Sequence, residues 1–208
     1  MIFEARTYTF KPGGAVREWI GRFGEAYPTR AKYSPLYGFF QTEIGPLNQV
    51  VHIWAYDSLQ QRADIRAQAA KDPSGKWPPV GVDLLVNQEN DILTPIKGMT
   101  AYREPQKFGE LYELRMYTYA AGEVAKVAEK FAEGYAARAK LYPVAGIWTS
   151  ELGNLNRLYQ LFPYKDWAHR DQVRAEYLKS GVWPVHTDSR PVSQLVRHMV
   201  PSAFSPLH

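Results

Sequence analysis

Cysteine is absent from the 208 residues of this chain. Its absence excludes disulfide bonds, thiolate nucleophiles, and the zinc and iron–sulfur centres that depend on cysteine ligands. The 5 histidines include no pair at i, i+4 spacing and no His-x-His motif, so the sequence gives little support for a bound metal. We expect no metal site. Haem ligation through His52 is an alternative that no motif in the chain requires.

Long apolar runs and nucleotide-binding motifs are also missing. No run approaches the roughly 18 residues of a membrane span, and neither a GxGxxG motif nor a P-loop occurs, so no nucleotide cofactor is expected. The chain begins with MIFEARTYTF, a strand-like pattern that resembles neither a signal peptide nor a transit peptide. The 25 basic and 21 acidic residues are scattered, without the basic stripe of a nucleic-acid-binding surface. We predict a soluble, cytoplasmic protein that binds neither membrane nor nucleic acid.

The sequence does contain one pattern that occurs twice. Residues 2–9 (IFEARTYT) return as residues 111–118 (LYELRMYT), and residues 27–48 return as residues 135–156. The repeat is about a hundred residues long, far longer than a solenoid unit, so each copy should bury its own core. The 45% of hydrophobic residues suffice for two such cores. The predicted domains are residues 1–96 and 110–208, with a linker at residues 97–109.

Hydrophobic periodicity predicts the same order of elements in each copy. The alternation of IFEARTYTF indicates a strand, and Val16, Trp19 and Phe23 recur at helical spacing. The elements expected in the first copy are strand 2–10, helix 15–33, strands 37–44 and 47–56, helix 58–71 and a strand around 84–93. The strands expected in the second copy lie near 111–119, 145–152, 157–164 and 192–200. This βαββαβ order is the ferredoxin-like plan, of the α+β class.

The two faces of the first strand differ in chemistry. Glu4, Arg6 and Tyr8 lie on one face, and Phe3 and Ala5 lie on the other. Helices cover one sheet face in this plan, and we expect them to cover the apolar set Phe3, Ala5, Val51 and Ile53. The polar and aromatic face carries too many aromatic side chains to be left in water, so it should pack against its counterpart from the second copy. We predict an α+β barrel with that face lining the lumen, closed either within one chain or between chains of a homo-oligomer.

Residues 43–77 (EIGPLNQVVHIWAYDSLQQRADIRAQAAKDPSGKW), preceded by FEARTYTFKPG at residues 3–13, closely resemble the NIPSNAP family. The resemblance rests on a Glu-x-Gly-x-Leu-Asn turn, a Val-His-x-Trp-x-Tyr strand, an Arg-x-x-x-Arg helix, and a tryptophan after a loop. It implies the dimeric α+β barrel fold shared with EthD-like proteins and antibiotic-biosynthesis monooxygenases. The second copy departs from the pattern where Gln160 replaces His52 and Phe162 replaces Trp54.

His52 is the best single catalytic candidate. An imidazole is the natural proton shuttle near neutral pH, and His52 is expected on the same face as Arg6 and Tyr8. We expect His52 to act as a base and Arg6 or Tyr8 to polarise a developing oxyanion. A hydrogen-bonded interior histidine is the structural alternative. The candidate ligand-binding residues are Glu4, Glu43, Trp54, Tyr56, Arg115, Tyr117, Gln160 and Tyr164.

The Glu4–Arg6 pair recurs as Glu113 and Arg115. When the copies pack, the two carboxylates and two guanidiniums should form one closed network. The simpler interpretation of this network is structural, because paired buried charges fix the register of packed sheets. The functional alternative is that the arginines hold an anionic substrate group. On the second helices we expect a solvated or domain-packing surface, not a site, at Arg62, Arg66, Arg170 and Arg174.

Three functions from different classes stay open. The first is an enzyme without nucleotide cofactor, monooxygenase-like or acid–base in mechanism, that acts on a small hydrophobic or aromatic molecule. The second is a non-catalytic carrier of such a ligand or of haem, and the third is an interaction or scaffold protein with a closed core. RNA-recognition domains share the βαββαβ order, but strand NQVVHIWAY lacks their K/R-G-F/Y pattern and the same face carries Glu4 and Glu43. RNA is therefore not an expected partner.

Overall fold

A computed structural model describes residues 1–181 and 183–208. The first half contains β1 (Ile2–Phe10), α1 (Ala15–Ala31), β2 (Leu36–Ile44), β3 (Gln49–Tyr56), α2 (Leu59–Ala70), the 3-10 turn η1 (Val82–Leu84) and β4 (Leu85–Pro95). The second half contains β5 (Leu111–Thr118), α3 (Val124–Leu141), β6 (Gly146–Leu152), β7 (Arg157–Tyr164), α4 (Trp167–Ser180) and β8 (Ser193–Pro201). The predicted α+β class and the tandem βαββαβ order are confirmed.

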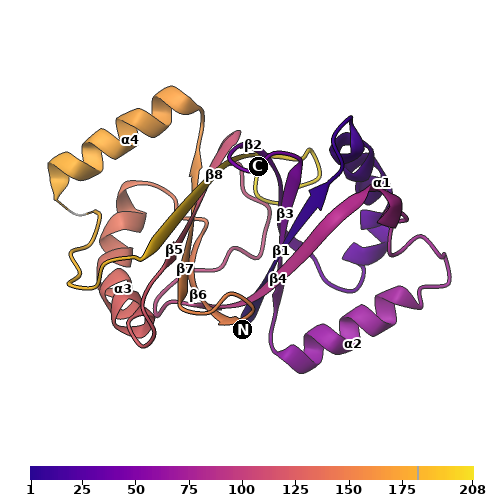
Figure 1. The fold of residues 1–208 in the computed structure, drawn as a ribbon, viewed down its shortest axis with the longest axis horizontal. Coiled ribbons are helices and arrows are strands. Elements are labelled where there is room, and N and C mark those ends of the chain that lie inside the picture. The colour runs from indigo at the N-terminus through magenta and orange to yellow at the C-terminus, as the bar shows by residue number, and fades with distance from the viewer. Residues whose placement is uncertain (182) are drawn as a thin grey trace.

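The described strands form one closed barrel in the order β1-β3-β2-β8-β5-β7-β6-β4. Each half contributes a four-stranded antiparallel sheet, and the halves join where β2 pairs with β8 and where β4 pairs with β6. The sequence left open whether the barrel closes within one chain; it does. Figure 1 shows the strands at the centre, with α1 and α2 outside one half and α3 and α4 outside the other.

Local signals set the start of the second helix in each half. Ser58 precedes α2 and accepts a hydrogen bond from the backbone N–H of Gln61, at 3.1 Å. Asp166 precedes α4 and accepts one from the backbone N–H of His169, at 2.8 Å. These caps satisfy N–H groups that have no partner within the first turn of a helix. Both second helices therefore begin at the same point of the repeat.

The hairpin turns are also reused. Asn48 and Asn156 end the turns of the two halves with positive φ angles of 56° and 57°, a conformation that asparagine adopts more readily than most residues. Their carbonyl groups accept hydrogen bonds from the backbone N–H groups of Phe10 and Tyr119, each at 2.8 Å. Each turn is thereby fixed to the end of the first strand of its own half.

Apolar side chains from both halves fill the lumen of the barrel. Phe3 of β1 lies 5.3 Å from Trp148 of β6, centroid to centroid, and both are fully buried. A Cβ atom added to Gly146 would overlap the indole of Trp148. The residues expected under the helices lie in this lumen cluster: Phe3, Ala5, Val51 and Ile53. The lumen is a packed core.

The polar and aromatic face lies on the outside of the barrel, under the helices. Tyr8 and Trp54 of the first sheet pack with Trp19 and Phe23 of α1. The prediction that this face lines the lumen is therefore wrong. Because side chains alternate along a strand, assigning one face to the wrong side of the sheet misplaces every residue of that face. The set comprises Glu4, Arg6, Tyr8, His52, Trp54 and Tyr56, with Glu113, Arg115, Tyr117, Gln160 and Tyr164 in the second half.

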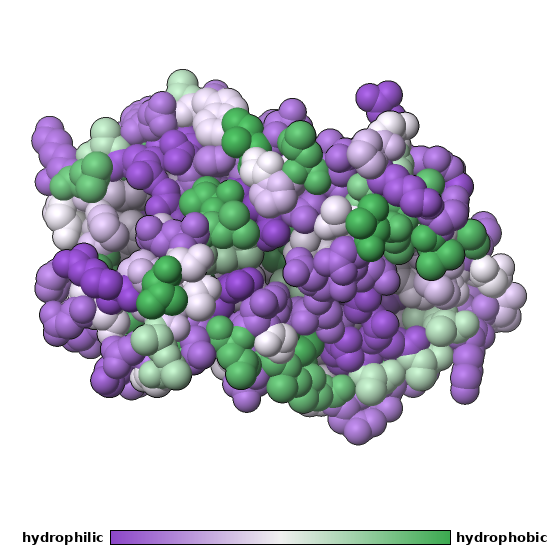
Figure 2. Space-filling model, viewed as in Figure 1, coloured by the Kyte–Doolittle hydropathy of each residue, from purple (hydrophilic) through white to green (hydrophobic). Residues whose placement is uncertain are grey.

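The surface is mixed in character. In the face shown in Figure 2, separate groups of hydrophobic residues lie among hydrophilic ones. None of the helices described is both long enough and apolar enough to pass through a membrane.

Candidate functional site

A pocket of about 140 Å³ lies between the first sheet and the helices of the N-terminal half. Aromatic rings form much of its wall, and Trp77 lies at the loop that follows α2. Arg6 comes from β1, Arg30 from α1 and Arg66 from α2, so that guanidinium groups from different elements line the same pocket. We call it the N-terminal pocket. Its further aromatic and imidazole lining comprises Tyr8, Trp19, Phe23, His52, Trp54 and Tyr56.

Glu4 neutralises part of this positive charge. Its carboxylate is fully buried, and its Oε1 atom lies 2.8 Å from Arg6 Nη1, 2.5 Å from Arg62 Nη2 and 4.0 Å from Arg66 Nη1. Burial is the largest single influence on Glu4 and raises its pKa, but the hydrogen bond from Arg62 and the charges of the arginines outweigh it. The pKa of Glu4 is therefore below its ordinary value, and the carboxylate is held ionised.

Arg30 adds a buried positive charge to the same pocket. No carboxylate is bonded to it among the described residues. Its side chain is 2% exposed, and it donates to the hydroxyl of Tyr56 at 3.0 Å and to the carbonyl of Ser34 at 3.3 Å. Its guanidinium lies 4.4 Å from the ring centroid of Trp54. Burial lowers the pKa of Arg30 from its ordinary value. The N-terminal pocket thus holds more buried positive than negative charge.

His52 lines the pocket and carries a hydrogen-bond donor. Its Nδ1 atom accepts a hydrogen bond from Trp54 Nε1 at 2.8 Å. Burial, with the charges of Arg6 and Arg66, holds the pKa of His52 well below its ordinary value, so the ring is neutral. A neutral imidazole that accepts at Nδ1 carries its proton on Nε2. In this arrangement Nε2 is a hydrogen-bond donor, and the base role of His52 stays a prediction.

Two donors of the N-terminal pocket are unused. His52 Nε2 and Trp19 Nε1 are buried, and neither has a hydrogen-bond partner within the described part of the chain. A buried donor that has lost water without gaining a partner costs about 1–3 kcal/mol. A ligand with an acceptor oxygen would relieve that cost.

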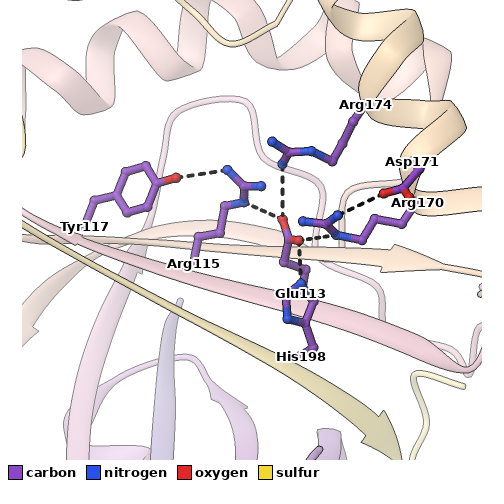
Figure 3. Close-up of polar contacts among 7 residues, drawn as sticks. All are labelled: Glu113, Arg115, Tyr117, Arg170, Asp171, Arg174 and His198. Atoms are coloured by element: carbon purple, nitrogen blue, oxygen red, sulfur yellow. Dashed lines mark hydrogen bonds and ion pairs between the residues drawn. The ribbon is translucent and has the colours of Figure 1, made fainter. Parts of the chain in front are cut away.

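A corresponding pocket of about 130 Å³ lies in the second half, and we call it the C-terminal pocket. Figure 3 shows the ion-pair network beside it: Glu113 and Arg115 project from β5, Arg170 and Arg174 from α4, and His198 from β8. Glu113 is bonded to Arg115, lies 2.5 Å from Arg170 Nε and 3.8 Å from Arg174 Nη1, and is 2.9 Å from His198 Nε2. The two networks follow the same plan.

His198 contacts the buried carboxylate of the second half. In the structure it lies opposite Glu113 on the neighbouring strand β8, where the first half has Ile92 opposite Glu4. His198 therefore adds a partner to the Glu113 carboxylate.

The predicted site residues separate into the two halves. Arg6, Tyr8, His52, Trp54 and Tyr56 line the N-terminal pocket. Arg115 and Tyr164 line the C-terminal pocket, Arg115 donates to the hydroxyl of Tyr117 at 2.9 Å, and Gln160 is paired with Arg115 across β5 and β7. The expected single network between the copies is wrong, because Glu4 and Glu113 each bind arginines of their own half.

Glu43 belongs to neither pocket lining. It is exposed near the end of β2 and lines an open groove of about 1010 Å³ beside α1 and the C-terminal segment that follows β8. The structure therefore separates Glu43 from the residues with which it was grouped.

The sequence interpretation missed the helix arginines. A solvated or domain-packing surface, and no site, was expected at Arg62, Arg66, Arg170 and Arg174, whereas they reach over the sheet to Glu4 or Glu113. A signal was present, because Arg66 and Arg174, like Arg30 and Arg138, recur in step with the two glutamates. Arginines retained in both copies together with a buried acid indicate a shared network.

Metal binding gains no support from the geometry. Within residues 1–181 and 183–208, no group of three or more His, Asp or Glu side chains is placed to hold a metal ion.

The geometry defines the class of protein: an α+β barrel built from two ferredoxin-like halves, with an arginine-rich aromatic pocket under the helices of each half. The NIPSNAP family model matches residues 3–98 and again residues 112–207. The chain belongs to the NIPSNAP family.

Known proteins agree with that assignment. Protein NipSnap homolog 3A of Homo sapiens is 28% identical over 222 residues, which cover 100% of this chain and 86% of that protein. Protein NipSnap homolog of Dictyostelium discoideum is 30% identical over 187 residues, covering 88% of this chain and 78% of that protein. A crystal structure described as a "putative monooxygenase" from Lactobacillus acidophilus has the same fold, with a TM-score of 0.63 and 14% identity over 96% of this chain and 93% of that chain.

Proposed function

We propose that the N-terminal pocket binds a small aromatic or similarly hydrophobic molecule with an acceptor oxygen, and stabilises its anionic form without a nucleotide cofactor. One observation carries the proposal: His52 and Trp19, each with an unused buried donor, line an aromatic pocket that Arg6, Arg30 and Arg66 make positive. A flat apolar ligand suits the aromatic walls, and an oxygen that bears negative charge suits the donors.

The size of the pocket supports a ligand of about one ring. An apolar cavity of roughly 150 Å³ accommodates benzene, and the N-terminal pocket has a volume of about 140 Å³. The half-exposed side chain of Arg66, 45% accessible to solvent, lies on the lining and places positive charge where solvent reaches the pocket. A charged substituent of the ligand can contact Arg66 there.

Stabilisation of an anion is a catalytic act when the anion is the reactive species. Removal of a proton from a phenol, or from carbon next to a carbonyl group, places negative charge on oxygen. Oriented donors stabilise that charge without reorganising. We assign this role to the Nε2–H of His52, with Arg6 supplying positive charge. Because none of the described lining residues is a carboxylate, the proton leaves to water.

Two reactions can follow from such an anion. Reprotonation at another atom gives an isomer, which is acid–base chemistry. Attack on dioxygen can convert a CH₂ group to a carbonyl group, with the second oxygen atom leaving as water. Formation of the anion is common to both, and it is the step that the pocket supports.

Cytoplasmic residence and homo-oligomer formation stay predictions from the sequence.

A phenol that changes colour on ionisation tests the proposal directly. At a pH below the pKa of free 4-nitrophenol, the wild-type protein is expected to increase the ionised fraction, which is measured by its visible absorbance. His52→Phe removes the donor and should weaken phenolate binding by about tenfold, because a hydrogen bond to a charged group contributes about 1.5–3 kcal/mol.

The matched control is His52→Gln, which retains an amide donor and places at position 52 the residue that the second half has at Gln160. His52→Gln should retain more of the absorbance change than His52→Phe. An unchanged signal in His52→Phe, in a protein of unaltered fold by circular dichroism, would show that His52 does not contact the ligand oxygen. Binding without turnover of any ionisable substrate would instead favour the carrier hypothesis.

A further inference from the structure

The two pockets share a plan but differ at the positions that would touch a reacting group. The C-terminal half has Gln160 where the first has His52, and Phe162 where the first has Trp54. On the helix side, Val127 takes the place of Trp19 in the repeated pattern. The C-terminal pocket therefore lacks the imidazole and the indole donor that define the N-terminal site. Its aromatic wall comprises Phe162, Tyr164, Tyr177 and Trp183.

We propose that the C-terminal pocket is a second binding site, which holds a small planar aromatic carboxylate and does not transform it. The proposal does not depend on the function proposed for the N-terminal pocket. It rests on a buried cation without a carboxylate partner, on unused donors and on the dimensions of the pocket.

Arg138 is the buried cation. Its side chain is 1% exposed and lines the pocket. Nη1 donates to the carbonyl of Tyr142 at 2.8 Å, whereas Nε is buried without a hydrogen-bond partner among the described residues. None of the ion pairs found in the described part of the chain includes Arg138. Burial lowers its pKa to about 10, so the guanidinium stays charged near neutral pH.

The nearby carboxylate is already shared. Glu113 has Arg115, Arg170, Arg174 and His198 around it, and Arg138 is not among them. Of the arginines that line the pocket, Arg115 and Arg174 contact Glu113. The guanidinium of Arg138 instead lies 3.8 Å from the ring centroid of Tyr177 and 4.8 Å from that of Phe162. These rings stabilise the cation in part, but they leave it without a counter-ion.

The dimensions and the donors indicate the chemical class of the ligand. The volume of about 130 Å³ is close to that of a cavity that holds one benzene ring, roughly 150 Å³. The hydroxyl of Tyr177 is buried without a partner in the described structure, which adds a neutral donor to the guanidinium of Arg138. A forked guanidinium binds a carboxylate through two parallel hydrogen bonds. A ring that bears a carboxylate satisfies both requirements.

Trp183 and Trp77 allow the two pockets to be observed separately. Trp183 lines the C-terminal pocket and Trp77 the N-terminal pocket. In protein labelled with 5-fluorotryptophan, the fluorine resonances of these residues can be assigned with Trp183→Phe and Trp77→Phe. Titration with benzoate is expected to shift the Trp183 resonance. Benzamide, which has the same shape without the charge, should bind at least about tenfold more weakly when its binding is measured by the same resonance.

Arg174→Gln and Arg66→Gln form a matched pair of variants. Both arginines are partly exposed, at 41% and 45%, so both variants should fold. Arg174 also lines the pocket, and its 3.8 Å contact with Glu113 is longer than a hydrogen bond, so its guanidinium can bind the ligand carboxylate beside Arg138. Arg174→Gln is therefore expected to weaken benzoate binding at Trp183 by about tenfold, whereas Arg66→Gln should leave it unchanged. Arg138→Lys keeps the charge but loses the fork, and it should weaken binding similarly. If Arg138→Lys fails to fold, the Arg174→Gln result decides.

Three results would overturn the proposal. They are a benzoate response at Trp77 with none at Trp183, equal responses of Trp183 to benzoate and benzamide, and a Trp183 response that Arg174→Gln leaves intact. None of them bears on the 4-nitrophenol absorbance in His52→Phe. Conversely, if His52→Phe leaves the 4-nitrophenol absorbance change intact, the benzoate-induced shift expected for the Trp183 resonance is unaffected. The two proposals therefore fail separately.

Discussion

Trp148→Ala is expected to lower the free energy of unfolding by about 3–5 kcal/mol, the range for removing a large aromatic side chain from a packed core. Trp148 is fully buried in the lumen, where it contacts Phe3 and Tyr37 at centroid distances of 5.3 and 6.2 Å. Side chains from both halves meet there, so one substitution should weaken the whole barrel. Urea unfolding monitored by circular dichroism measures the loss.

The matched control is Trp167→Ala, because Trp167 at the start of α4 is 43% exposed. The free energy of unfolding of this variant should fall by about 1 kcal/mol or less, as is common for surface substitutions. Indole provides a second test, because an apolar cavity left by a missing side chain can bind a molecule of matching shape. Indole should raise the melting temperature of Trp148→Ala by more than it raises that of the wild type. A Trp148→Ala protein as stable as the wild type would mean that the lumen is not a packed core.

The packed lumen shows what the sequence predicts and what it does not. The repeat, the alternation of IFEARTYTF and the helical spacing of Trp19 and Phe23 predicted the elements and the fold, because these signals are local. The assignment of the sheet faces failed. Both faces carry large apolar side chains, with Phe3 on one and Trp54 on the other, so hydrophobicity alone does not identify the lumen side.

The charged residues of the first strand were assigned to the wrong face because their ion-pair partners are distant in the sequence. Glu4 and Arg6 looked unsuited to a position under helices, where apolar contacts are expected. The charges are accommodated there because Arg62 of α2 reaches Glu4 across 58 positions of the chain. A local pattern does not show such a partner. The retention of Arg66 and Arg174 in step with the two glutamates was the available evidence for it.

Glu4→Gln is expected to lower the free energy of unfolding by about 3 kcal/mol. Removing one partner of a buried ion pair commonly costs about 3–5 kcal/mol, because the other charge stays buried. The lower end applies here, since Arg6 and Arg62 are 15% and 21% exposed and recover some water. Arg66→Gln is the control. Its contact with Glu4 is 4.0 Å long and its side chain is 45% exposed, so it should lose about 1 kcal/mol or less.

The same carboxylate should give the protein a particular dependence on pH. The pKa of Glu4 in the folded state is below its ordinary value of 4.5, so the unfolded chain binds its proton first as the pH falls. The stabilisation by Glu4 is thus complete above pH 4.5 and is lost as the pH falls through that value toward the folded pKa. Glu113, whose pKa is also lowered, adds to the loss in the same range.

His52 acts in a separate range. Its pKa is lowered from an ordinary value of 6.5, so the unfolded chain gains a proton on this imidazole before the folded protein does. Its contribution to stability is complete above pH 6.5 and declines as the pH falls below that value. Urea midpoints measured from pH 7.5 to pH 3.5 should therefore decline in two stages. His52→Gln should flatten the upper stage, and Glu4→Gln should flatten the lower one. If Glu4→Gln left the lower stage as steep as in the wild type, Glu4 would not be ionised in the folded protein, and the arginine network would have another counter-ion.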